Sequence, residues 1–297
     1  MRALGLVASA PMDEPRTNLG KARSFDNVVD ASDRARSAYP DEAALWLTGQ
    51  GQARVLELGA GTGNLTAGLV ARGHTVTATD PSEPMLRRLV ERVPGAHGVL
   101  ASAECMPVAS RSVDVVVAAQ AFHWFDSERV LPEIARVLKP RGALALIWNE
   151  RDERIPWVRR LGAIIGQNIG NGRFDPSRIL DDSGLFETVQ RSTFRFWQPT
   201  TRQSLHDLVL SRSNVAVLAQ SERQQVIGKV DRLYDDYGRG HDGMLMPYVT
   251  HAYRAVVLPW AVREDVVVTA GPVTGRANGT TIGPDDPGTD SLLIDFR

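Results

Sequence analysis

The amino-acid sequence predicts an α/β protein with a doubly wound, mostly parallel sheet. Apolar segments typical of buried strands alternate with helical segments through its first half, which is the pattern of parallel α/β folds. The chain has 297 residues, 43% of them hydrophobic, so it can fill one large core. Residues able to bind a ligand stand where these strands end. Right-handed crossovers place such strands in one sheet, whose carboxyl edge binds ligands.

The stretch RVLELGAGTGNLT, residues 54–66, is the strongest functional signal. Its apolar beginning predicts a strand of a parallel sheet, buried on both faces. Gly59, Gly61 and Gly63 then allow the backbone to turn tightly into a helix whose amide groups face outward. The stretch therefore predicts a seat for a small polar ligand.

The other elements of the first half follow in a regular order. A helix over Asp41–Leu47 precedes the first strand. Val113–Ala119 reads VDVVVAA, a near-continuous apolar run that predicts a central strand. The other predicted strands are Arg54–Gly59, Thr75–Asp80, a short one near Val99, and Ala143–Trp148; the other predicted helices are Asn64–Arg72, one that Ser82 caps and Pro94 stops, and one that begins at Asp126 or Ser127 and ends near Leu138.

The periodicity changes after Glu150. Helical and extended patterns are mixed there, and we interpret them as a substrate-facing region followed by the last strands of the same sheet. The predicted helices are Val158–Ile169, Leu205–Ser213 and Glu222–Tyr237, and the predicted extended segments are Phe186–Trp197 and Met246–Val257.

Composition narrows the class of protein. The chain has 34 basic and 35 acidic residues, so its net charge of -1 gives no electrostatic footprint for nucleic acid. The single cysteine, Cys105, fits a reducing compartment, and we interpret it as buried and unreactive. No apolar run approaches the roughly 20 residues that span a bilayer. We therefore expect a cytoplasmic protein that binds neither nucleic acid nor membranes.

Two carboxylates narrow the ligand. Glu57 precedes the first glycine by two positions, where a negative charge would repel a pyrophosphate and suit a cationic or amino group. Asp80 ends the second strand, where acidic residues accept hydrogen bonds from ribose hydroxyls. The pair indicates a ribose with a positively charged substituent.

Four motifs then resemble those of class I S-adenosylmethionine-dependent methyltransferases in order and spacing. They are VLELGAGTGNLT, ATDPSEPML, ASAECMPVASRSVDVVVAAQAFHWFD and EIARVLKPRGALALIWNERD, which together span residues 54–152. The resemblance implies a Rossmann-like seven-stranded sheet with a helical insertion. It also implies S-adenosylmethionine as the cofactor and S-adenosylhomocysteine as its product, with no metal.

A finer resemblance is to trans-aconitate-type small-molecule methyltransferases. It rests on AFHWFD, on a segment near the start of the chain and on a late strand. Ser32, Ser37 and Ser102 depart from residues common in relatives. The matching residues outside AFHWFD are Phe25, Asp26, Arg36, Tyr39 and Pro40, and later Pro247, Tyr248, Thr250, Tyr253, Arg254 and Ala255.

The resemblance covers a methyltransferase domain over 25–257. Residues 1–24 lack periodicity and predict a flexible arm, and the Gly, Pro, Thr and Asp content near the end predicts a disordered tail over 258–297. Within the domain, 54–152 would form the cofactor-binding core and 153–245 the substrate-facing region.

Carried over by position, the resemblance assigns the cofactor contacts. The glycine turn would hold the methionine portion and Asp80 the ribose, with other residues around the adenine and beneath the sulfonium. The full set is Glu57, Gly59, Gly61, Gly63, Asp80, Pro81, Met85, Ser102, Ala103, Glu104, Gln120 and Ala121.

The residues around the methyl acceptor leave alternatives open. His123 is a candidate general base, a hydrogen-bonding residue of the site, or a neutral histidine packed beside Trp124. Trp124 and Trp148 would shape an acceptor pocket or belong to the core. Asn149 and Arg151 would bind a carboxylate, although a surface ion pair is the commoner fate of an arginine. Tyr39 completes the predicted substrate-binding set.

The predicted function is methyl transfer from S-adenosylmethionine to an oxygen of a small molecule, either a carboxylate or a hydroxyl. N- or C-methylation of a small molecule or peptide is one alternative. A nicotinamide-dependent oxidoreductase and a non-methylating cofactor-binding protein of the same fold are the others. The sequence predicts no oligomeric state.

Overall fold

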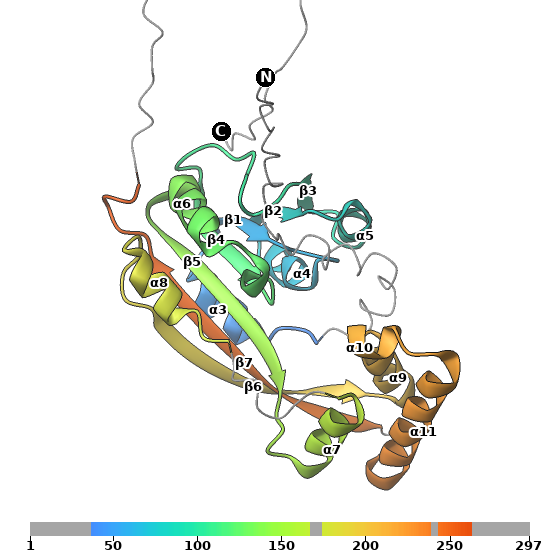
Figure 1. The fold of residues 1–297 in the computed structure, drawn as a ribbon. Coiled ribbons are helices and arrows are strands. Elements are labelled where there is room, and N and C mark those ends of the chain that lie inside the picture. Colours follow the sequence, from blue (N-terminus) through green and yellow to red (C-terminus); the bar gives the residue numbers. More distant parts are fainter. Residues whose placement is uncertain (1–36, 167–173, 239–242, 263–297) are drawn as a thin grey trace, which may run out of the picture.

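A computed structural model describes residues 37–166, 174–238 and 243–262 (Figure 1). One sheet of seven strands runs through this part of the chain, in the order β3-β2-β1-β4-β5-β7-β6. All pairs are parallel except those of β7, which is antiparallel to both neighbours. The strands are β1 (Arg54–Leu58), β2 (Thr75–Asp80), β3 (Ala96–Leu100), β4 (Val113–Ala119), β5 (Leu138–Arg151), β6 (Gln190–Thr200) and β7 (Met244–Val256).

This order confirms the predicted fold class. The chain proceeds outward from β1 through β2 to β3, then returns to place β4 on the other side of β1. The carboxyl ends of β1 and β4 therefore form the point where the winding direction reverses. Doubly wound sheets bind ligands at such a point.

Helices cover both faces of the sheet. α3 (Asp41–Thr48), α4 (Asn64–Ala71) and α5 (Glu83–Arg92) lie on one face, and α6 (Ser127–Val137) and α8 (Ser177–Ser183) on the other (Figure 1). From Val115 to Ala119 the central strand β4 is apolar because both of its faces are covered. Val115 and Val117 pack on the α3 face, and Val116 and Ala118 pack on the α6 face.

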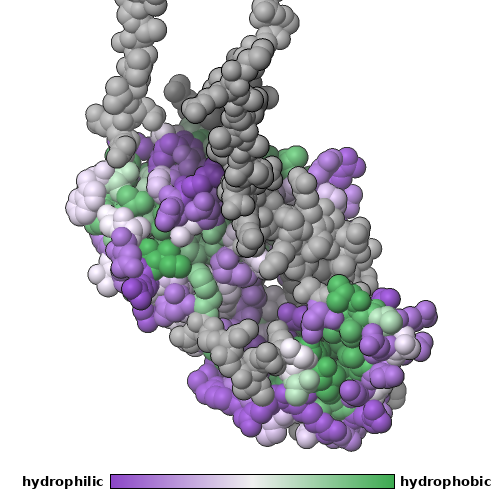
Figure 2. Space-filling view, in the orientation of Figure 1, coloured by the Kyte–Doolittle hydropathy of each residue, from purple (hydrophilic) through white to green (hydrophobic). Residues whose placement is uncertain are grey.

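Four further helices gather at one end of the long strands β5, β6 and β7 (Figure 1). They are α7 (Pro156–Ile164), α9 (Arg202–Leu210), α10 (Ser213–Ala216) and α11 (Gln220–Tyr237), here called the distal helical group. Their core is separate from that of the main sheet and closes on β7. Figure 2 shows hydrophobic residues gathered over this group with hydrophilic residues around them. The buried members are Val158, Leu161, Ile165, Leu205, Leu208, Val209, Val215, Val230, Leu233, Tyr234, Met244, Met246 and Tyr248.

Strand β5 is longer than the predicted Ala143–Trp148. At its start Leu138 pairs with Val113, and Lys139 Nζ lies 2.7 Å from Asp114 Oδ1. At its far end, pairing with β7 continues to the register Arg151↔Tyr248. A local pattern could not show this extension, because it depends on a partner strand about 100 residues away in the chain.

The region after β5 serves two cores. α8 packs with α6 on the main sheet, where Leu180 and Phe186 are buried, while the other helices form the distal helical group. The first residues of the predicted tail also pack: Leu258 N donates to Leu185 O, and Val262 is buried. The predicted arm over 1–24, the matching residues Phe25, Asp26 and Arg36, the departing residue Ser32, and positions 263–297 lie outside the described residues. In the segments that are described, no helix is both long and apolar enough to cross a membrane.

Candidate active site

The glycine turn after β1 depends on backbone conformations that side chains disfavour. Gly59, Gly61 and Gly63 have φ values of +66°, +57° and +86°. A Cβ atom on Gly59 would lie 2.7 Å from Ala121 Cβ, and one on Gly63 would lie 2.9 Å from Leu89 Cγ. The turn is therefore held tightly between the end of β4 and helix α5.

Asp80 ties the end of β2 to this turn. Its Oδ2 accepts a hydrogen bond of 2.8 Å from the Gly61 amide, and its Oδ1 accepts one of 2.9 Å from the Ser82 amide. A carboxylate offers about four acceptor positions, so one group can hold the turn and also accept from a ribose. Pro81 is exposed beside it, and Met85 is buried in the first turn of α5.

Glu57 lies in β1 beneath the turn and is 1% exposed. Thr66 Oγ1 donates to its Oε2 at 2.7 Å, and its Oε1 has no hydrogen-bond partner among the described residues. Burial raises the pKa of Glu57 to about 8; the Thr66 bond opposes this rise, and the charge of Asp80 adds to it. The predicted repulsion of a pyrophosphate therefore needs correction, because this carboxyl is mostly protonated near pH 7.

The loops after β3 and β4 complete this edge. Ala103 is buried in the main core, and Glu104 Oε1 accepts from the Asp126 amide at 3.2 Å at the start of α6. The backbone carbonyl of Ser102 accepts a hydrogen bond from the Cys105 amide. Gln120 adopts a φ of +57°, which is uncommon for a residue with a side chain and marks a constrained position.

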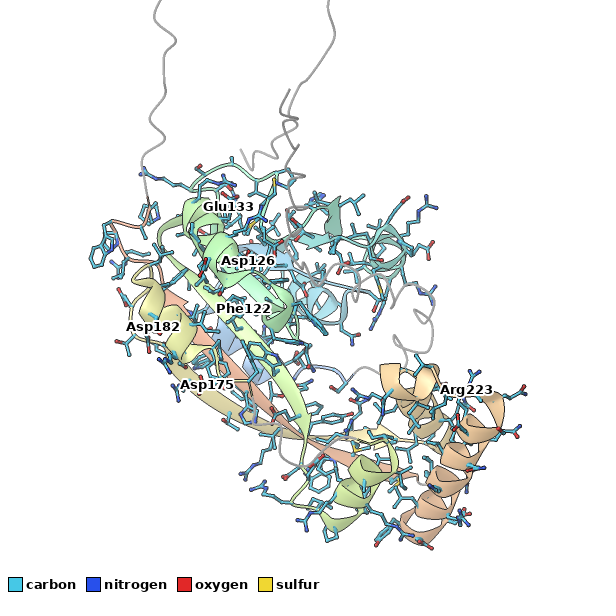
Figure 3. The ribbon with its side chains drawn as sticks, viewed as in Figure 1. Phe122, Asp126, Glu133, Asp175, Asp182 and Arg223 are labelled. Carbon is cyan, nitrogen blue, oxygen red and sulfur yellow. The ribbon has the colours of Figure 1, made fainter. Side chains whose placement is uncertain are left out.

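An aromatic cluster follows β4 on the α6 face. The 3-10 helix η2 (Phe122–Trp124) brings the His123 ring 4.8 Å from the Trp124 ring and 6.0 Å from the Phe174 ring. Both His123 and Trp124 are exposed, whereas Phe122, labelled in Figure 3, is buried. Partial desolvation lowers the pKa of His123, which favours the neutral form of its ring.

Successive residues of β5 face opposite sides of the sheet, and this separates the predicted acceptor residues. Trp148 is buried on the α6 face, with its ring 5.2 Å from that of Phe174. Asn149 and Arg151 lie on the α3 face. The structure therefore brings Trp148 toward His123 and Trp124 but does not bring Asn149 or Arg151 to them.

The carboxyl edge of the sheet, with the glycine turn and the loops after β2, β3 and β4, is here called the donor edge. Asn149 connects this edge to the first residues that the structure describes. Its Nδ2 donates to Ser37 Oγ and to Ala38 O, both at 2.8 Å, and its Oδ1 accepts from Thr250 at 2.6 Å. Gln120 Nε2 donates to its carbonyl at 3.2 Å. Asn149 thus positions the segment before α3, where the half-buried Tyr39 packs against the α3-face core.

Arg151 lies at the end of β5, directly opposite Tyr248 of β7. Burial lowers the pKa of its guanidinium, which the charges of Tyr248 and Glu153 partly counteract. Tyr248 is 7% exposed; burial raises the pKa of its hydroxyl, while the charges of Arg151 and Arg212 and a hydrogen bond with Ser37 oppose the rise. The end of β5 therefore brings the charges of two arginines to bear on one nearly buried hydroxyl.

The structure also corrects the interpretation of Cys105 and adds residues that the sequence analysis missed. Cys105 is exposed, because Ala103 and Met106 take the inward positions of its loop. Phe174 had no distinguishing sequence signal, and Arg212 lies far from every motif. Tyr248 is one of the residues that match trans-aconitate-type methyltransferases, but the resemblance assigned it no role.

Comparisons with known proteins place the chain in a family. Residues 56–146 match the family model described as a methyltransferase domain. An uncharacterized methyltransferase of Mycobacterium tuberculosis is 42% identical over 239 residues, which are 79% of this chain and 96% of that protein. The chain belongs to the class I S-adenosylmethionine-dependent methyltransferases.

Two other comparisons are narrower. A malonyl-[acyl-carrier protein] O-methyltransferase of Methylococcus capsulatus is 44% identical over 99 residues, 31% of this chain and 36% of that protein. A solved structure of a candidate type II methyltransferase from Anaeromyxobacter dehalogenans covers 74% of this chain and 97% of its own, with a TM-score of 0.53 and 22% identity. The latter similarity concerns the fold. The finer resemblance to trans-aconitate-type enzymes stays a prediction.

The residues of this methyltransferase fit the cofactor of its family. The glycine turn has no room for side chains at Gly59 and Gly63, so it keeps the close backbone course that the family's glycine motif requires. Glu57 offers a buried acceptor atom beneath the turn, and Asp80 stands where a ribose would be held. When bound, S-adenosylmethionine supplies an electrophilic methyl group on a positively charged sulfur. The individual contacts of the cofactor remain predictions.

We predict that Asp80→Asn weakens the binding of S-adenosylhomocysteine about 10- to 100-fold. The asparagine side chain has one acceptor oxygen fewer and no negative charge. It can no longer accept hydrogen bonds from the Gly61 amide, the Ser82 amide and a ribose hydroxyl together. Titration calorimetry measures the dissociation constant. Glu83→Gln is the matched control, since Glu83 is exposed on the adjoining helix and pairs with Arg87. Equal affinity in both variants would contradict the assigned role.

A second prediction concerns the pH dependence of stability. The folded-state pKa of Glu57 lies near 8 and its ordinary value is 4.5, so folding takes up a proton between these values. The free energy of unfolding of the wild type should therefore fall, relative to Glu57→Gln, as pH rises from about 4.5 to about 8. Urea unfolding of both proteins at pH 5 to 8.5 measures the difference. A difference that stays constant across this range would show that Glu57 is not held protonated.

Proposed function

We propose that this methyltransferase methylates an oxygen of a small, anionic acceptor, with a carboxylate oxygen favoured over a hydroxyl. The observation that carries the proposal is the charge of the surface next to the donor edge. Beyond Asn149, the α3 face of the sheet carries the guanidinium of Arg151, on β5, and the hydroxyl of Tyr248, on β7. Hydrogen-bond donors and positive charge suit an anion, whereas a protonated amine would need carboxylates.

A chain of contacts leads from the glycine turn, where the methyl donor would bind, to Arg151, where the acceptor would bind. Ala121 is adjacent to Gly59 of the turn, and its neighbour Gln120 donates to the Asn149 carbonyl. Arg151 follows Asn149 by two residues, which is about 7 Å along a strand. An acceptor of a few carbon atoms would therefore reach from the donor edge to Arg151.

A carboxylate acceptor also needs no general base. A carboxylate oxygen is already anionic at neutral pH and attacks without losing a proton. Its alignment beside the donor, with water excluded by the surrounding residues, can then supply much of the acceleration. His123 lies on the α6 face, away from Arg151, so its proposed role is to hold the aromatic cluster beside the turn.

The partial similarity to a malonyl-[acyl-carrier protein] O-methyltransferase supports an oxygen acceptor, because that protein is named for O-methylation. The small-molecule nature of the acceptor and a cytoplasmic location are further parts of this proposal. N- and C-methylation are the competing outcomes.

The proposal predicts the chemistry of the product. The full chain is incubated with isotope-labelled S-adenosylmethionine and a metabolite extract of its host, and labelled products are identified by mass spectrometry. We expect methyl esters, which dilute alkali hydrolyses with release of labelled methanol. Labelled methyl ethers would show that the acceptor oxygen is a hydroxyl and not a carboxylate. Methylamines or C-methyl products alone would overturn the proposal.

The proposal also predicts the effect of His123→Asn. For a carboxylate acceptor this change should lower kcat by less than about tenfold and leave the acidic limb of the pH–rate profile in place, since no base is removed. Steady-state kinetics with the acceptor found above measures both. A loss of about 100-fold or more, together with loss of that limb, would make His123 a base for a hydroxyl.

A further inference from the structure

We propose that Arg151, Arg212 and Tyr248 form a subsite for an anionic group of the acceptor that is not itself methylated, either a second carboxylate or a phosphate. The inference rests on the proposed function and extends it. It makes the acceptor a molecule with one reacting oxygen and at least one separate negative charge.

Three elements bring these side chains together. Arg151 of β5 and Tyr248 of β7 are partners in the antiparallel register, so their side chains leave the same face of the sheet. Arg212 lies in the connection between α9 and α10, within the distal helical group. The hydroxyl of Tyr248 is close enough to both guanidinium groups to interact with their charges. The cluster therefore joins the sheet to the distal helical group.

The surroundings suit an anion. Tyr248 is nearly buried, its ring stacks on Phe196 at 5.3 Å, and its hydroxyl bonds with Ser37. Burial keeps this hydroxyl protonated and thus able to donate. Among the described residues, the charge of Glu153 acts on Arg151. The charges of Arg151 and Arg212 both act on the Tyr248 hydroxyl, and positive charge there favours an anion over a cation.

The reaction itself indicates which anion binds there. A carboxylate that accepts a methyl group loses its negative charge on the way to the ester. A guanidinium pair held against that carboxylate would stabilise the charged reactant more than the transition state and would slow transfer. The same pair is compatible with catalysis when it holds a group that stays anionic throughout. Binding energy from such a distant group can align the reacting oxygen.

The test uses the full chain loaded with S-adenosylhomocysteine and three probes: glutarate, inorganic phosphate and the neutral glutaramide. Calorimetry should show glutarate or phosphate binding to the wild type. Arg212→Gln and Arg151→Gln should each weaken that binding about tenfold or more, because a charge-assisted hydrogen bond is lost. Tyr248→Phe should weaken it less, and Arg212→Lys should keep more affinity than Arg212→Gln. Glutaramide should bind no more tightly to the wild type than to these variants.

Arg223→Gln is the matched control, since Arg223 is an exposed arginine on α11 of the same helical group (Figure 3). It should leave anion affinity within twofold of the wild type. An equal effect of Arg212→Gln and Arg223→Gln would overturn the subsite, and so would failure of both anions to bind the wild type. Affinity for S-adenosylhomocysteine, measured in the same samples, should be unchanged in Arg212→Gln and shows that this variant is folded.

The outcome is distinguishable from failure of the proposed function. With the natural acceptor, Arg212→Gln should raise KM and leave kcat largely intact. If methyl esters form but this KM does not change, only the subsite is wrong. If the anions bind as expected and the products are methylamines, the proposed oxygen acceptor is wrong.

Discussion

The carboxylate of Asp80 is the interaction on which the donor edge depends. By accepting from the amides of Gly61 and Ser82, it joins the glycine turn after β1 to the start of the helix after β2. The two loops lie at neighbouring carboxyl ends of a parallel sheet, where backbone amides would otherwise point outward without partners. One carboxylate thus sets the shape of the turn before any ligand arrives.

Glu57 adds a second constraint beneath the same turn. A buried carboxyl costs least when it carries a proton, which is why its pKa rises while Asp80, bonded to two amides, stands at the edge. Two carboxyl groups close in the sequence therefore serve different purposes. Asp80, buried at the edge, is the predicted acceptor for a ribose, and Glu57 in the strand beneath is the predicted partner of an amino group.

The predicted residues around the methyl acceptor are divided by strand β5, whose successive side chains point to opposite faces of the sheet. Because adjacent residues of a strand face opposite ways, Trp148 joins the aromatic cluster on one face while Asn149 and Arg151 serve the other. The antiparallel strand β7 then supplies Tyr248 opposite Arg151, and the distal helical group supplies Arg212. Two arginines from distant parts of the chain thus act on one nearly buried hydroxyl, in a protein whose net charge is only -1.

The sequence by itself determined the fold class, the order of the first strands and the position of the glycine turn. These features are local: apolar periodicity, glycine spacing and the residues that end each strand are visible without a partner. Only the tertiary structure decided the length of β5, the exposure of Cys105, the protonation of Glu57 and the separation of Trp148 from Arg151. Each of these depends on which segment packs against which, and Arg212 meets Tyr248 only because the distal helical group folds onto the end of β7. The physical reason is that burial and charge are properties of the packed chain, whereas periodicity is a property of the sequence.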